Sequence, residues 1–123
     1  MRTGIDLLAL YKTLGLSQGS VCKLVGIKDV ESLRRQVKDK ARIYEKTWQI
    51  LDKLAEQRDR EIDRLVEANK DKTHVTFPLW DGNHWEGEYR NSIVLTAAWI
   101  LEGDGITVTY QWGEPIIRDD RSL

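Results

Sequence analysis

Gly15 and Gly26 divide the beginning of this chain into short segments that have the pattern of helices. From residue 4 to residue 14, apolar side chains recur three and four positions apart, and Gly15 follows where a left-handed C-terminal cap would lie. Ser17 is a natural N-cap for a second segment of about eight residues, which Gly26 ends. The spacing therefore predicts two short amphipathic helices joined by a tight turn.

A third short helix is predicted after Gly26, with Asp29 as its N-cap. One face is apolar and should pack on the first two helices; the opposite face is charged. The apolar face comprises Val30, Leu33 and Val37, and the charged face comprises Glu31, Arg34, Arg35 and Lys38. A short helix, a tight turn and a second helix that presents long hydrogen-bonding side chains to solvent are typical of a helix-turn-helix, whose second helix lies in the major groove of DNA.

These side chains suit base recognition. An arginine can bond both guanine acceptors with one planar fork, and a carboxylate can accept from the cytosine amino group. The expected base contacts are Glu31, Ser32, Arg34 and Arg35. Because helix N-termini and cations attract phosphates, the expected phosphate contacts are Ser17, Gln18, Lys38, Lys40 and Arg42. The alternative is a solvated face, since a charged stripe opposite an apolar one occurs on any surface helix.

The net charge of −1 conceals a strong polarity along the 123 residues. Residues 1–43 contain nine Lys and Arg against four acids, whereas residues 73–123 contain three Arg against eight acids. The resulting +5 and −5 are expected if the first part meets a polyanion and the last part must not. Chance asymmetry remains an alternative in a chain of this size.

Between these parts, no glycine or proline interrupts the chain from Tyr44 to about Asn69, where apolar residues keep helical spacing. One helix of about seven turns is predicted. A polar run at residues 57–61 places Arg58 on the apolar stripe, so we expect this helix to leave one core before it joins another and to act as a spacer. A coiled coil is the weaker alternative because the apolar seam is short.

The last part of the chain, residues 73–123, alternates between patterns typical of strands and of a helix. Residues 73–79 predict a short strand that ends at Pro78, and a turn is expected around residues 81–83. Residues 93–101 predict a buried helix that begins after a Ser92 cap and ends at Gly103. Residues 106–112 alternate apolar and polar side chains and predict a second strand.

A helix that is apolar all round is too hydrophobic for about fifty residues to bury alone, so a second copy of the chain should cover it. An aromatic dimer interface is favoured over a ligand pocket. Its expected residues are Trp99, Ile100, Val108, Tyr110 and Trp112. The predicted fold is mainly α with a small α+β C-terminal part, in three regions: a helix-turn-helix region (1–43), a long connecting helix (44–72) and a dimerisation region (73–123).

Several other classes of function are not supported by the sequence. No apolar run is long enough for a membrane span, and Asp6 interrupts the position of a signal peptide, so the expected location is the cytoplasm. His74 and His84 lack a recognised metal-ligand spacing, and Cys22 is favoured as a small core residue over a nucleophile. We therefore expect no enzymatic activity, no cofactor or metal and no small-molecule effector.

The segments Leu14-Gly15-Leu16-Ser17-Gln18 and Leu24-Val25-Gly26-Ile27 resemble the Cro and lambda-repressor-like, XRE-type, helix-turn-helix family. Residues 29–43 look like the recognition segment of its YdiL-like branch, which includes anti-CRISPR-associated autorepressors. Ser32, Arg34, Lys40 and Ile43 match the pattern of that branch. Leu33, Gln36 and Asp39 replace two tryptophans and a glycine, so Asp39 is expected to adopt the turn conformation that glycine adopts more easily.

The resemblance implies a long helix after the reading region and a C-terminal part used for dimerisation. The predicted function is a homodimeric transcriptional repressor that binds an inverted repeat in a promoter, and the resemblance alone implies control of its own operon and an association with phages or mobile elements. The rival hypothesis is a protein-binding module, such as an antitoxin or phage inhibitor, that acts through the acidic, tryptophan-rich last third.

Overall fold

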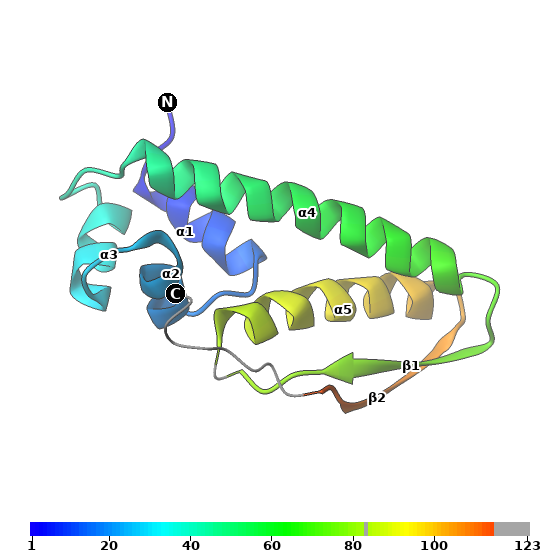
Figure 1. Cartoon of the computed structure of the whole chain (residues 1–123). Helices are drawn as coiled ribbons and strands as arrows, with labels where there is room; N and C mark the ends of the chain where they lie inside the picture. Colours follow the sequence, from blue (N-terminus) through cyan, green and yellow to red (C-terminus); the bar gives the residue numbers. More distant parts are fainter. Residues whose placement is uncertain (83, 115–123) are drawn as a thin grey trace.

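The computed structural model describes residues 1–82 and 84–114, and this part of the chain is mainly helical (Figure 1). Three short helices come first, a long helix runs across the top of the view, and a helix with two strands completes the chain. The strands form a small parallel sheet. The elements are α1 (Gly4–Thr13), α2 (Gln18–Val25), α3 (Val30–Val37), α4 (Glu45–Asn69), β1 (His74–Leu79), α5 (Trp85–Gly103) and β2 (Thr107–Trp112).

The predicted caps of the three short helices are confirmed. Gly15 and Gly26 have φ angles of 77° and 82°, the left-handed conformation expected after a helix. The Ser17 hydroxyl accepts the N–H of Ser20 at 3.2 Å. The Asp29 carboxylate accepts the N–H of Ser32 at 2.8 Å, so both predicted N-caps form.

The inward face of α1 is narrower than its apolar sequence suggests. Leu7, Tyr11 and Leu14 are buried because steps of four and three residues keep them on one side of the helix. Ile5 belongs to the predicted apolar stripe, yet 69% of it is exposed. Two residues before Leu7, it lies on roughly the opposite side of the helix.

The beginning of α1 lies directly on the end of α3. A Cβ atom on Gly4 would overlap the carbonyl oxygen of Val37, so only glycine permits this approach. Asp39, directly after α3, adopts a φ of 59° as expected, and its carboxylate accepts the Gly4 N–H at 2.7 Å. The hydrogen bond helps to hold Asp39 in a conformation that is uncommon for a residue with a side chain.

The expectation that the long helix is a spacer is wrong. α4 packs on α1 and α2 near its beginning and on α5 along much of its length. Arg58 is central to the reason: its side chain is only 14% exposed, and its guanidinium donates to the Thr96 hydroxyl at 2.8 Å and to the Ser92 hydroxyl at 3.4 Å. Hydroxyl groups on α5 thus allow a cation within the apolar stripe to lie against a neighbouring helix.

The C-terminal elements form a β1–α5–β2 unit. Both strands are predicted correctly to within about one residue, and they pair in parallel with Val75 beside Val108 and Phe77 beside Tyr110. Parallel strands require a crossover connection, and α5 provides it. The predicted beginning of this helix was wrong: α5 starts at Trp85 with His84 as N-cap.

Ser92, the expected cap, instead lies inside α5, where its hydroxyl donates to the Tyr89 carbonyl oxygen at 2.8 Å. The first two turns of α5 were missed because they are polar and contain Gly87. Of the turn expected around residues 81–83, Asn83 lies outside the described residues, as do residues 115–123 of the predicted dimerisation region.

The buried side chains form two clusters. The larger one is built from α1 to α4, and Tyr89 and Ile93 of α5 belong to it. The smaller one joins the sheet, through Val75 and Phe77, to the second half of α5. The three short helices and the C-terminal unit therefore share a core, across the predicted boundaries at residues 43 and 72.

Candidate nucleic-acid interface

Helix α3 lies at one end of the molecule, away from the sheet (Figure 1). Leu33 is completely buried, and Val30 and Val37 pack beside it, as the sequence predicted. On the other side, the four side chains of the predicted charged face are exposed: Glu31, Arg34, Arg35 and Lys38. Ser32, the remaining predicted base contact, is half-buried. The hydrogen bond from the Ser32 N–H lowers the pKa of the Asp29 carboxyl, which therefore carries its charge at the N-terminus of α3.

Arg34 connects the two helices of the candidate interface. Gln18 is the first residue of α2, and its side-chain oxygen accepts a hydrogen bond from the Arg34 guanidinium at 3.4 Å. The same guanidinium lies 3.8 Å from the Glu31 carboxylate. These contacts are long, and the Arg34 side chain is 57% exposed. The guanidinium is therefore oriented by its neighbours while its outer edge remains accessible to a ligand.

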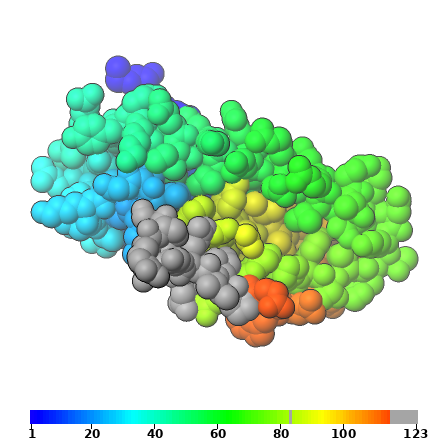
Figure 2. Space-filling model, viewed as in Figure 1, coloured from blue at the N-terminus to red at the C-terminus, as the bar shows by residue number. Residues whose placement is uncertain are grey.

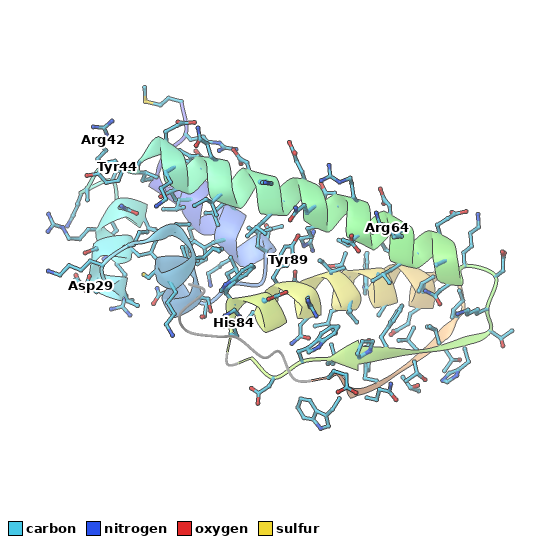
Figure 3. All side chains as sticks on the ribbon, in the orientation of Figure 1. Asp29, Arg42, Tyr44, Arg64, His84 and Tyr89 are labelled. Carbon is cyan, nitrogen blue, oxygen red and sulfur yellow. The ribbon has the colours of Figure 1, made fainter. Side chains whose placement is uncertain are left out.

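The chain after α3 presents the cations that were predicted to contact phosphates. Lys38, Lys40 and Arg42 are all exposed. The Arg42 guanidinium lies 5.3 Å from the centre of the Tyr44 ring, a cation–π contact at the beginning of the long helix (Figure 3). The Gln36 amide, which is buried, donates to the Arg42 carbonyl oxygen at 3.1 Å and so fixes this loop to α3.

The beginning of α2 differs from the simple phosphate site expected at Ser17 and Gln18. The Ser17 N–H donates to the Glu88 carboxylate of α5 at 3.0 Å. A phosphate that used this amide would first have to displace a carboxylate from it. Gln18, directed instead toward Arg34, is half-buried beside the charged face of α3.

A second accessible surface, which we call the aromatic face, lies on α5 and β2. Trp99 and Trp112 are 78% and 81% exposed, and Tyr110 and Ile100 are also exposed, whereas Val108 is half-buried. Leu95, one helical turn before Trp99 and 48% exposed, was missed by the sequence analysis. Its place in the helix could have revealed it, since residues four apart share a face.

The geometry explains why the aromatic face is uncovered. Val108, Tyr110 and Trp112 alternate with threonine and glutamine along β2, so they share one side of the sheet. Their partners on β1, Val75 and Phe77, are buried against α5, whereas Tyr110 and Trp112 on β2 are exposed. The described part of α5 and β2 thus leaves several large apolar side chains exposed, as protein-binding surfaces do.

Other candidate chemistry is sparse. Burial raises the pKa of the Cys22 thiol, which disfavours the reactive thiolate. Within residues 1–82 and 84–114, no three His, Cys, Asp or Glu side chains are grouped so as to hold a metal ion. In the same residues, no helix has the length and apolar character needed to cross a bilayer.

A groove of about 740 Å³ lies between α4, β1 and α5. Its lining is mostly apolar and aromatic and includes Arg60, Arg64 and Arg90. Two of these arginines already pair with carboxylates, Arg64 with Glu61 at 2.6 Å and Arg90 with Glu86 at 2.7 Å. Their positive charges are therefore largely compensated.

Comparison with known proteins adds no family assignment: no protein-family model matches the chain, and no curated protein matches its sequence significantly.

Proposed function

We propose that this protein is a sequence-specific DNA-binding transcriptional regulator that acts as a homodimer in the cytoplasm, most simply as a repressor of its own promoter. The observation that carries the proposal is the charged face of α3. Arg34 and Arg35 are exposed on a short helix that is capped by Asp29 and packed through Leu33 on the helix before it. A helix held in this way can enter a major groove as a rigid element.

In this mechanism α3 is the recognition helix of a helix-turn-helix formed with α2. Arg34 and Arg35 bond guanine edges, and Glu31 and Ser32 contact neighbouring bases. Lys38, Lys40 and Arg42 neutralise phosphates and supply much of the affinity, which therefore falls steeply as salt is added. Gln18 is placed to contact a phosphate or to hold Arg34 in its reading position.

The aromatic face supports the dimeric form. In a two-fold dimer each residue of the face meets the same face of the partner, so one apolar patch on the chain suffices for a closed pair. Such a dimer presents two copies of α3 to an inverted repeat, with half-sites about one helical turn apart. Binding across a promoter would then exclude RNA polymerase and repress transcription.

The proposal is tested by gel-shift titration of the full chain with the DNA upstream of its gene. Arg35→Ala should weaken specific binding by about 1–3 kcal/mol, the value of one good arginine–guanine pair. The matched control is Arg64→Ala, an exposed arginine on α4 at a distance from α3 (Figure 3), which should leave binding almost unchanged.

If the chain shifts neither this DNA nor any member of a random duplex library, or if both variants lose affinity equally, the proposal is wrong. Absence of DNA binding together with an intact aromatic face would favour the rival function, a protein-binding module that acts through Trp99 and Trp112.

A further inference from the structure

The turn between α1 and α2 is bound to α5 by a carboxylate. The two oxygens of Glu88 accept the Ser17 N–H at 3.0 and 3.3 Å, and both lie 2.9 Å from the Ser20 hydroxyl, which donates to them. A negative charge at the N-terminus of a helix is favourable, and hydrogen bonds to an ionised acceptor are stronger than neutral ones. Glu88 therefore ties α2, the first helix of the proposed reading unit, to the C-terminal unit.

The backbone of the same turn lies against α5 with no space between them. Gly15 has a positive φ, and a Cβ atom there would come within 2.8 Å of the Ser92 Cβ atom and 3.0 Å of the Glu88 carbonyl oxygen. A side chain at this position would force the turn away from the helix. Glycine thus serves here both to end α1 and to permit the close contact.

The contact continues into the core. Tyr89 and Ile93 of α5 are buried in the same cluster as Leu14 and Leu16, which flank Gly15. The Tyr89 hydroxyl donates to the Leu54 carbonyl oxygen of α4 at 2.9 Å. Contacts between parts that move against each other are usually small and polar, whereas this one is continuous with the hydrophobic core.

We infer that Glu88 and Gly15 form a clasp that fixes the direction of α3 relative to the aromatic face, so that the homodimer accepts a single half-site spacing. The inference rests on the proposed function and extends it to the kind of DNA that is bound. One added base pair moves a half-site by about 3.4 Å and turns it by about 35°, a change that two rigidly held recognition helices cannot follow. In this account Glu88 is a positioning residue that touches no base.

The clasp is tested first without DNA, by ¹⁵N relaxation of the dimer of this chain. In the wild type, one rotational diffusion tensor should fit the amides of α1–α3 and those of α5 and β2 together. In Glu88→Ala the buried core still joins the two groups, so one tensor should still fit, but the amides of residues 15–20 should show added exchange on the microsecond to millisecond timescale. Glu56→Ala, which removes the same charge from an exposed position on α4, should behave as the wild type. Independent motion of the two groups in the wild type would reject the clasp.

The spacing is then tested with duplexes selected from a random library and remade with one base pair added or removed between the half-sites. Wild type and Glu56→Ala should lose about tenfold or more in affinity for each shifted duplex, a loss of the size caused by a mismatched base pair. Glu88→Ala should lose about threefold or less while selecting the same half-site sequence, and Glu88→Gln, which keeps one acceptor oxygen, should be intermediate.

Simple destabilisation would lower affinity for every duplex equally and would not change the preferred spacing. Equal binding of several spacings by the wild type, or an undiminished penalty in Glu88→Ala, would overturn the inference. If no duplex is selected at all, the proposed function and the spacing rule fail together, and the diffusion tensors still decide whether the clasp exists.

Discussion

The two ends of this molecule expose opposite kinds of surface. At one end, α1 to α3 form a buried core and expose charge: Leu7, Leu14 and Leu33 are fully buried, while Arg34 and Arg35 are accessible. At the other end, the β1–α5–β2 unit exposes apolar area and few cations. Figure 2 shows α3, in light blue, at the left of the molecule and the last described residues, in orange, at the lower right.

The difference indicates that the two ends are suited to different partners. A face of long cations held by a complete core matches a polyanion, for which electrostatics supply affinity. A face of exposed tryptophan and tyrosine matches another protein surface, since burial of aromatic side chains dominates such contacts. A shared hydrophobic core joins the parts of the chain that bear these two faces and so holds the faces in one relative orientation.

The largest expected effect concerns the close packing of the first end. Gly4→Ala should destabilise the fold by about 3 kcal/mol or more, because the new methyl group meets backbone atoms of Val37 that cannot rotate away. Gly103→Ala, at the end of α5 with open space around it, should change stability by well under 1 kcal/mol. Chemical denaturation of both variants measures the contrast, and equal stabilities would mean that α1 does not approach α3 in this way.

The second prediction concerns the aromatic face. Trp99→Glu should convert a dimer into a monomer, because a buried aromatic at the centre of an interface commonly contributes about 2 kcal/mol or more and the new carboxylate would have to be desolvated. Thr107→Glu, on the polar side of the sheet, is the control and should remain dimeric. Sedimentation equilibrium measures both, and an unchanged Trp99→Glu dimer would place the interface elsewhere.

The smallest expected effect concerns the N-cap of α3 and its dependence on pH. The folded state lowers the pKa of Asp29 below 3.8, so the ionised cap stabilises the fold above that pH, and this contribution is lost as the pH falls through the lowered pKa. Asp29→Asn keeps an acceptor for the Ser32 N–H and removes the titration. Melting temperatures from pH 2 to pH 6 should therefore fall slightly more steeply with acid in the wild type than in the variant, and parallel curves would contradict the assigned role.

Local patterns predicted most of the elements because their causes are local. The caps at Ser17 and Asp29 act on amide groups three residues away. The beginning of α5 could not be predicted in this way. Its polar first turns do not have the apolar pattern of the rest of the helix, and they are helical because Tyr89 enters a core made by residues far away in the chain.

The candidate site shows the same contrast between features with local causes and features that depend on distant residues. Charge and helical spacing were enough to select Arg34, Arg35 and Lys38 as an exposed row, and the structure places them on one accessible face. Nothing near Ser17 in the sequence indicated that its amide would be occupied, because Glu88 lies 71 residues away. The polar run around Arg58 predicted a stretch of α4 that leaves the core and faces solvent. Instead, the Arg58 guanidinium donates to hydroxyl groups on α5 and lies against that helix.

Apart from the beginning of α5, the sequence by itself determined where the helices begin and end, which of their faces are apolar and how charge is distributed along the chain, since each depends on residues a few positions apart. Only the tertiary structure decided that the strands pair in parallel, that α4 packs along α5 and that Glu88 holds the turn before α2. These features depend on which distant surfaces meet, and that choice minimises exposed apolar area and unpaired polar groups over the whole chain at once.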